Sequence, residues 1–244
     1  QVSRAGQEED LIFPTSIDLM GDKLYVTDDF HHANKVLMFS THGSYLGSVP
    51  DPRTKKVSMR NPKAVEAVES AGVFYVCDRS NNRILKFDDG GTYLSTIDMP
   101  SGFREPNGIA VTPGGIIYIT LKISGIVGKI SSRNVVNKFT VFRETPGGSE
   151  QVELAKPSGI AVDDEGNIYI ADTANQRVLI ANQMGKLITV IDRQKIPELE
   201  TYYPMSLKLG PHGDFVYLVA SNRYSYDITC KDKCNGKIWK IDIK

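Results

Sequence analysis

The stretch "PSGIAVDDEGNIYIADTANQRVLIANQMGKLITVI", residues 157–191, contains four short runs of strand-forming residues separated by turn-forming ones. The expected strands are Gly159–Val162, Ile168–Ala171, Arg177–Ala181 and Leu187–Ile191. The turns at residues 163–167 and 184–186 each contain a glycine. None of the runs shows the apolar spacing of a helix. This stretch therefore predicts four sequential antiparallel strands.

The same arrangement recurs five times along the chain. A proline precedes the first strand each time, in steps of 48, 44, 51 and 47 residues: Pro14, Pro62, Pro106, Pro157 and Pro204. A tyrosine among apolar residues follows 11 to 13 residues later: Tyr25, Tyr75, Tyr118, Tyr169 and Tyr217. A basic residue and a β-branched one then open the third strand: Lys35-Val36, Arg83-Ile84, Lys129-Ile130, Arg177-Val178 and Lys237-Ile238. Three markers in one order make chance a poor explanation.

A unit of four strands that repeats in this way is typical of a β-propeller blade. We predict an all-β fold, a single propeller domain over residues 1–244 with five blades that start near residues 14, 62, 106, 157 and 204; six blades are the alternative. The last repeat provides only three strands, Ser206–Leu209, Phe215–Ala220 and Lys237–Ile243. We expect Val2–Ala5 to supply its fourth strand and so close the ring.

Several segments resemble the NHL-repeat family. The best matches are Pro157-Ser-Gly-Ile-Ala-Val-Asp163, Gly166-Asn-Ile-Tyr-Ile-Ala-Asp172, Asn175-Gln-Arg-Val178 and, in the second repeat, Asp78-Arg-Ser-Asn81-Asn-Arg83-Ile84. The resemblance covers nearly the whole chain, but the first repeat has a longer segment at 28–35 and the third has Thr120 in place of the Asp. It implies a propeller, and propellers of this family serve as binding platforms, RNA binders and occasionally enzymes.

The motif residues themselves have a structural interpretation. Asp172 and Asn175 are expected to satisfy backbone donors in the loop between strands two and three, and Arg177 to pair with an acidic neighbour. The five tyrosines are expected at regular strand positions between blades. The acidic run at 163–167 is expected to be a turn rather than a calcium loop, because it lacks alternating oxygen ligands. Function is therefore sought in the loops that depart from the repeat.

The irregular loops are expected on one face of the propeller. Loops from strand two to three, and from strand four to the next blade, share this face, which we call the top face. Tyr and Arg, which dominate binding hot spots, occur in these loops beside the last repeat. We predict a recognition module that binds a protein or small ligand there, through Tyr202, Tyr203, Arg223, Tyr224, Tyr226 and Asp227.

Two other functions are alternatives. RNA binding would use basic top loops, through Arg53, Lys55, Lys56, Arg60, Arg79 and Arg104. The 29 basic and 29 acidic residues cancel, which argues against a chain that is basic throughout but not against a local basic face. A lyase or hydrolase site at the central channel is the other alternative; His31, His32, His42 and His212 do not converge, and no nucleophile or phosphate-loop motif occurs. We predict no cofactor and no metal.

The cysteines and the hydropathy bear on the compartment. Cys230 and Cys234 lie three residues apart in the insertion of the last repeat, and we favour a disulfide between them over free thiols or a metal site. Cys77 is expected to be a buried free thiol. A disulfide favours a secreted or extracellular protein over a cytoplasmic one. No apolar run reaches the roughly 20 residues that span a bilayer, so no membrane insertion is expected.

Overall fold

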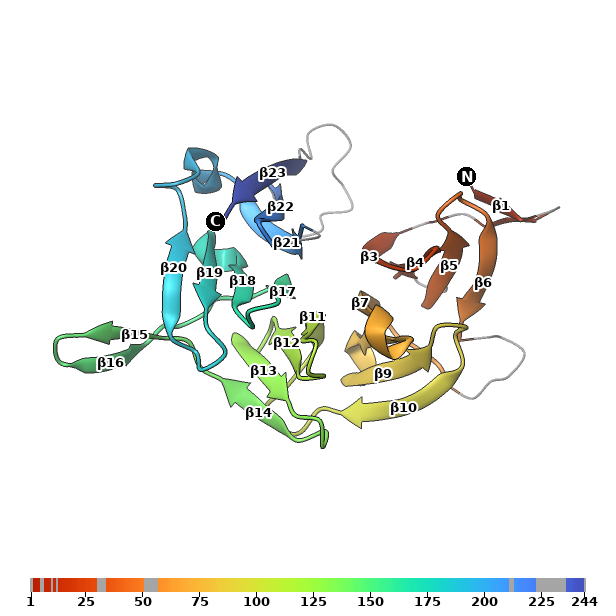
Figure 1. Cartoon of the computed structure of the whole chain (residues 1–244), viewed down its shortest axis with the longest axis horizontal. Helices are drawn as coiled ribbons and strands as arrows, with labels where there is room; N and C mark the ends of the chain where they lie inside the picture. Colours follow the sequence, from red (N-terminus) through yellow and green to blue (C-terminus); the bar gives the residue numbers. More distant parts are fainter. Residues whose placement is uncertain are drawn as a thin grey trace. The chain divides into compact units, whose positions relative to one another are not determined.

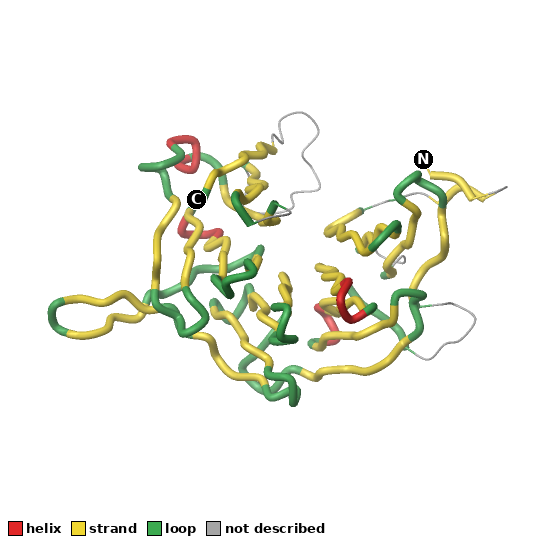
Figure 2. Tube along the Cα trace, in the orientation of Figure 1, coloured by secondary structure: helices red, strands yellow, loops and turns green. Residues whose placement is uncertain are grey.

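The computed structural model describes residues 2–4, 7–9, 11, 13–29, 34–50, 57–210, 213–222 and 236–243. Their regular structure is almost entirely β-strand, and the helical part consists of four short 3₁₀ turns (Figure 2). The turns are η1 (Glu69–Ala71), η2 (Arg79–Asn81), η3 (Thr173–Asn175) and η4 (Pro197–Glu200). The chain divides into two compact units, residues 1–109 and 110–244.

The first unit contains two complete blades and an N-terminal hairpin. Blade one has the strand order β3 (Pro14–Met20), β4 (Lys23–Asp28), β5 (Lys35–Ser40) and β6 (Tyr45–Val49). Blade two has the order β7 (Pro62–Val68), β8 (Val73–Asp78), β9 (Arg83–Asp88) and β10 (Tyr93–Asp98) (Figure 1). The hairpin pairs β1 (Val2–Arg4) with β2 (Gln7–Glu9).

The boundary between the units falls within the first strand of blade three. Blade three has the order β11 (Pro106–Val111), β12 (Ile117–Leu121), β13 (Ile126–Ile130) and β14 (Val136–Phe139). Blade four consists of β17 (Ile160–Val162), β18 (Ile168–Asp172), β19 (Arg177–Ala181) and β20 (Leu187–Ile191). The last blade consists of β21 (Tyr203–Leu209), β22 (Phe215–Ser221) and β23 (Gly236–Asp242). These sheets are five blades of a β-propeller, as predicted.

Each core lies between neighbouring blades, because an apolar sheet face is stable only when another sheet covers it. Tyr25, Phe74 and Phe87 belong to the core of blades one and two. Corresponding apolar clusters join blades three and four, and blades four and five. Polar contacts reinforce the seams: the Tyr25 hydroxyl donates to the Asp89 carbonyl at 2.9 Å, and the buried Thr173 hydroxyl donates to the Pro204 carbonyl at 2.7 Å.

The N-terminal strand forms a local hairpin that was not predicted. Val2–Arg4 pairs with Gln7–Glu9, and the last sheet has three strands in the described part of the chain. Pairing of Val2–Ala5 with the last blade would join the two units and stays a prediction. Only residues 5–6 separate β1 from β2, so the local hairpin closes a far shorter loop than pairing with the opposite end of the chain.

A second hairpin, β15 (Phe142–Thr145) with β16 (Gly148–Gln151), interrupts the path from blade three to blade four. It stands out from the neighbouring sheet (Figure 1), and its residues are almost all exposed. The Phe142 amide donates to the Gly185 carbonyl at 2.8 Å, and Lys186 forms a 2.7 Å ion pair with Glu144. The hairpin is thereby fastened at its base to the β19–β20 turn.

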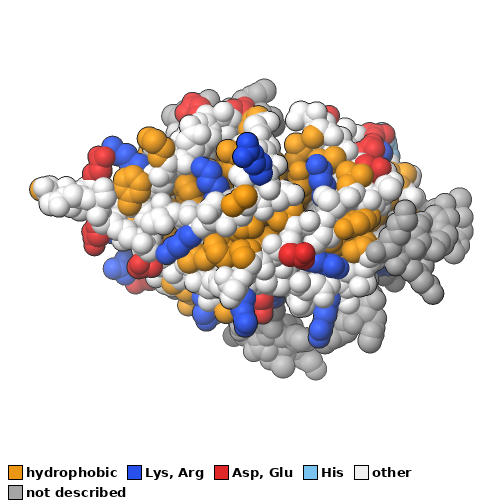
Figure 3. Space-filling view, turned by 90° about the horizontal axis from the view of Figure 1, so that it is seen from below, with side chains coloured by type: hydrophobic (Ala, Val, Ile, Leu, Met, Phe, Trp, Pro, Cys, Tyr) orange, Lys and Arg blue, Asp and Glu red, His pale blue; other side chains and the backbone are white. Residues whose placement is uncertain are grey.

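Outer strands carry a shared irregularity in three blades. The register of β6, β10 and β20 shifts by one residue, so that one residue of each is left out of the pairing: Leu46, Leu94 and Ile188. All three side chains are exposed. A β-bulge of this kind turns an extra side chain outward. Apolar side chains are also visible at the surface among lysines and arginines in Figure 3.

Candidate functional site

The NHL-type motif of blade four forms a buried hydrogen-bond network. The Asp172 carboxylate is fully buried and accepts bonds from the Ala155 amide at 2.7 Å, Asn175 Nδ2 at 2.8 Å and Arg177 Nε at 2.7 Å. Arg177 also donates to the Glu153 carbonyl at 3.0 Å. The network ties the incoming chain to the loop between strands two and three. The predicted pairing of Arg177 with an acidic neighbour is confirmed. Asp172 does satisfy a backbone donor, but that donor is Ala155 before the first strand, and Asn175 donates to Asp172 instead of accepting from the loop, so this part of the prediction is corrected.

Blade two repeats this network. Asp78 accepts from the Arg60 amide at 2.7 Å, from Asn81 Nδ2 at 2.9 Å and from Arg83 Nε at 2.8 Å, and Arg83 donates to the Ser58 carbonyl at 2.6 Å. Blade three has a hydroxyl at this position, and the Thr120 hydroxyl donates to the Ser158 carbonyl at 2.5 Å. These polar groups bond other segments of the chain, so a ligand-binding site is better sought on other surfaces.

Tyr202, the first of the predicted aromatic residues, lies at a small cluster on the last blade. Its ring meets that of Trp239 edge to face at 5.9 Å, and the Lys237 ammonium lies 5.1 Å from the centre of Tyr202 and 5.8 Å from that of Trp239. Lys237 also approaches Glu198 at 3.6 Å. Both rings are half-buried. We call Tyr202, Lys237 and Trp239 the aromatic corner.

The other predicted ligand-binding residues divide into two groups. Tyr203 begins β21, pairs with Ser221 and is half-buried. The rest lie outside the described residues: Arg223, Tyr224, Tyr226 and Asp227, with Cys230 and Cys234 of the predicted disulfide. Sequence reasoning missed Trp239, although it is the chain's one tryptophan, because it sits within a regular strand rather than an irregular loop.

The last blade also exposes an apolar sheet face. Ile238 is 70% exposed, Tyr217 42% and Val219 38%. Val219 lies opposite Ile238 across the β22–β23 pair, and Tyr217 opposite Lys240. Lys240 lies 3.9 Å from the centre of the Phe215 ring, which makes an edge contact with Tyr217. Tyr25, Tyr118 and Tyr169 belong to cores between two blades of one unit.

Three of the six predicted RNA-binding residues lie within the described ranges. Arg79 forms an ion pair with Glu105, with Nε at 2.9 Å and Nη2 at 2.5 Å. Arg60 and Arg104 are exposed. Arg53, Lys55 and Lys56 lie outside the described residues. The carboxylate beside Arg79 offsets its charge and so weakens its attraction for phosphate.

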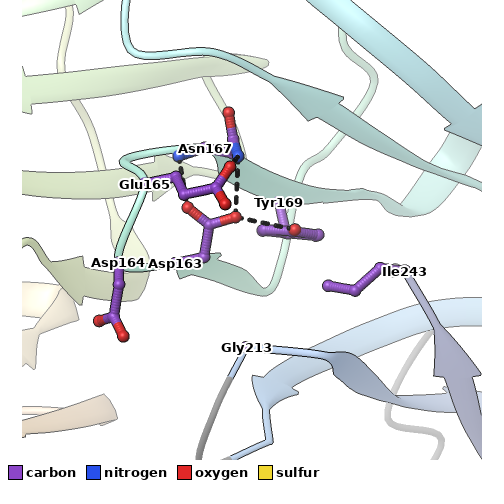
Figure 4. Close-up of a pocket in the computed structure, with 7 residues that line it drawn as sticks. All are labelled: Asp163, Asp164, Glu165, Asn167, Tyr169, Gly213 and Ile243. Carbon is purple, nitrogen blue, oxygen red and sulfur yellow. Dashed lines mark hydrogen bonds between the residues drawn. The ribbon is translucent and has the colours of Figure 1, made fainter.

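A pocket of about 170 Å³ opens where the β17–β18 turn faces Gly213 and Ile243 of the last blade (Figure 4). Asp163 accepts bonds from the Asn167 amide at 2.8 Å, Asn167 Nδ2 at 2.9 Å and the Tyr169 hydroxyl at 3.0 Å. Burial and the Asp163 carboxylate raise the pKa of Tyr169 well above its ordinary value. The carboxylate oxygens thus stabilise the turn, which confirms the interpretation of the acidic run as a turn.

Across the described ranges, no three His, Cys, Asp or Glu side chains gather in a way that could hold a metal ion. The helical part of the described residues is limited to four 3₁₀ turns, and none of them is long and apolar enough to cross a membrane. Cys77 is a buried free thiol, as predicted.

Several solved structures have a similar fold. In solved structures, virginiamycin B lyase from Staphylococcus aureus matches 95% of this chain and 85% of its own, with a TM-score of 0.55 and 15% identity. A protein of unknown function from Bacteroides caccae matches 94% of this chain and 77% of its own, with a TM-score of 0.64 and 14% identity. A chain of a nidogen/laminin complex matches 77% of this chain and 66% of its own, with a TM-score of 0.55 and 17% identity. At such identities the likeness shows the fold alone.

The fold thus defines the chain as a β-propeller. No curated protein matches it in sequence. The family model of the NHL repeat matches residues 154–180, the stretch that contains the Asp172 network. The chain therefore contains an NHL repeat within a five-bladed β-propeller, and both findings support the resemblance to the NHL-repeat family.

Proposed function

We propose that this propeller is a recognition module that binds a protein partner through the aromatic corner of its last blade. The observation that carries the proposal is the half-exposed Tyr202–Trp239 pair with the Lys237 ammonium lying near both rings. Large rings held in place bury much apolar area at little entropic cost, and Trp and Tyr are enriched among binding hot spots.

A protein partner fits this surface better than a small molecule does. Small ligands bind in concave sites that enclose most of their surface. Neither Tyr202 nor Trp239 lines the pocket beside the β17–β18 turn. A nidogen/laminin complex includes a chain of similar fold, which supports protein recognition as a use of this architecture.

The alternatives have less support. RNA binding stays a prediction, because three of its six residues lie outside the described ranges and Arg79 is paired with Glu105. A lyase shares the fold, but a fold carries many unrelated functions, and catalysis must be argued from a site. The aromatic corner offers contact area rather than a set of acid, base and nucleophile.

Partner capture from source-organism extract tests the proposal. The baits are the wild-type chain, Tyr202→Ala, Trp239→Ala and the control Tyr45→Ala, which removes a half-buried tyrosine from blade one. Thermal melts establish that each bait is folded. We expect a protein that the wild type and control retain and that the first two variants bind about 30-fold more weakly.

Nuclease and salt arms separate this outcome from RNA binding. A captured protein that resists nuclease supports the aromatic corner. Recovery that requires RNA and falls steeply with salt contradicts the proposal and favours the basic loops. Equal capture by wild type and both aromatic-corner variants also contradicts it.

A further inference from the structure

The sequence Thr-Pro-Gly-Gly occurs twice in the chain, at residues 112–115 and 145–148. The second copy forms the tip of the β15–β16 hairpin, in which every residue from 143 to 151 is exposed. The hairpin stands out from the neighbouring sheet (Figure 1), and the contacts that fasten its base, with Gly185 and Lys186, come from the same unit. Thr145 is therefore a threonine directly before a proline on a projecting turn.

The first copy lies in a different setting. Thr112 is half-buried at the turn between β11 and β12, and its hydroxyl oxygen accepts a hydrogen bond from the Ile116 amide at 3.0 Å. The Thr145 hydroxyl instead donates to the Gly148 carbonyl at 2.8 Å within the exposed hairpin. The structure thus separates two copies of one motif, because one hydroxyl joins two inner strands of a blade and the other lies at the surface.

An enzyme can reach Thr145 after only local opening of the hairpin. Each strand of the hairpin has four residues, and an isolated pair of strands is marginally stable in water. The exposed residues bury little apolar surface, so few contacts are lost when the turn opens. A proline restricts the residue before it to extended conformations, so Thr145 keeps an extended backbone in the opened segment.

We propose that Thr145 is a phosphorylation site for a proline-directed protein kinase. Proline has no amide hydrogen, so a kinase pocket without an acceptor at the next position selects it over residues whose N–H would be left unsatisfied. Thr145 Oγ1 attacks the γ-phosphorus of ATP, the bond from that phosphorus to the leaving ADP oxygen breaks, and the hydroxyl proton passes to a carboxylate of the kinase. The inference does not rest on the function proposed for the aromatic corner.

The neighbouring charges predict what the new phosphate contacts. Residues two apart in a strand lie on one face, so Arg143 and Thr145 share a face of β15. Arg143 approaches Glu150 of β16 at 3.6 Å, and both side chains are more than half exposed. A phosphate carries a charge of about −1.5 to −2 at pH 7 and accepts bidentate bonds from a guanidinium group, so it should displace Glu150 as the partner of Arg143.

Phosphate incorporation into the full chain tests the inference. The wild type, Thr145→Ala, Pro146→Ala and the control Thr112→Ala are each incubated with Mg²⁺ and ATP, in parallel with a purified proline-directed kinase and with source-organism extract. Thermal melts establish that each chain is folded, and mass spectrometry of the peptides locates the phosphate. We expect phosphate on Thr145 in the wild type and in Thr112→Ala, loss of most incorporation in Thr145→Ala, and a rate about tenfold lower in Pro146→Ala.

A phosphorus resonance tests the contact with Arg143. In the phosphorylated chain, the pKa of the phosphate should be lower than in phosphorylated Arg143→Gln, because the guanidinium cation favours the dianion. Identical titration curves would overturn this pairing.

Each contrary result in the incorporation assay overturns the phosphorylation site itself. No phosphate on Thr145, equal phosphorylation of Thr112 and Thr145, or a rate that Pro146→Ala leaves unchanged shows that the hairpin is not a site of this kind. Transfer by the purified kinase but not by the extract shows an accessible hydroxyl only, and this result also contradicts the inference.

Discussion

Replacing Asp172 by Ala should destabilise the second unit by about 3 kcal/mol. The carboxylate is 0% exposed and accepts three hydrogen bonds of 2.7–2.8 Å, one of them from a guanidinium group. Hydrogen bonds to charged groups contribute about 1.5–3 kcal/mol each, and removing one partner of a buried pair costs about 3–5 kcal/mol. The Arg177 side chain is 23% exposed and keeps its bond to Glu153, so the loss should lie toward the lower end.

Urea unfolding followed by Trp239 emission measures this loss, because Trp239 belongs to the same unit as Asp172. With a slope of about 2 kcal/mol per molar urea, the midpoint should fall by about 1.5 M. Asp172→Asn, which keeps the size of the side chain, should lose less. Asp164→Ala removes an exposed carboxylate from the same blade and should change little. A loss below about 1 kcal/mol for Asp172→Ala would refute a structural role for the motif.

Three further predictions concern other parts of the fold. Gly185 has φ +91°, and a Cβ added there would lie 2.1 Å from the Thr140 carbonyl oxygen. Gly185→Ala should therefore destabilise the base of the β15–β16 hairpin and speed protease cleavage there. The control Gly115→Ala, at φ +78° with open space around it, should lower the free energy of unfolding by less. Burial raises the pKa of Tyr25 from 10.0 to about 12, so its contribution to the unfolding free energy is present below pH 10 and lost as the pH rises through 12; Tyr25→Phe should be insensitive over this range. Burial raises the pKa of the Cys77 thiol, so alkylation at pH 8, read by mass spectrometry, should modify it only after unfolding; rapid native labelling would contradict its burial.

The sequence predicts the blades because local patterns determine them. The expected strands of blade four differ from the observed ones by one residue at two ends, and the bond from Arg177 to Asp172 matches the expected pairing with an acidic neighbour. Turn glycines and the period of apolar residues are local signals, and the repeat reinforces each of them five times. The fold class therefore follows from sequence alone.

Features that depend on distant or weak signals were not predicted. The residues of the β15–β16 hairpin are polar and lack a strand pattern, although Pro146-Gly147-Gly148 is a turn signal. The pairing of Val2–Arg4 with Gln7–Glu9 was not predicted, because these short segments carry no strand pattern, although a short hairpin closes a small loop. Trp239 was missed because it lies within a regular strand, whereas the predicted binding residues all came from irregular loops.

Trp239 offers the most direct test of recognition at the aromatic corner, because this chain has one tryptophan and it lies in the middle of β23. The wild-type chain and Tyr202→Ala, each labelled with 5-fluorotryptophan, are titrated with the captured partner while the fluorine resonance of Trp239 is recorded. The account predicts a saturable shift for the wild type and an affinity about 30-fold weaker for Tyr202→Ala. A resonance that stays unchanged while the partner binds would contradict it, because binding would then occur away from the aromatic corner.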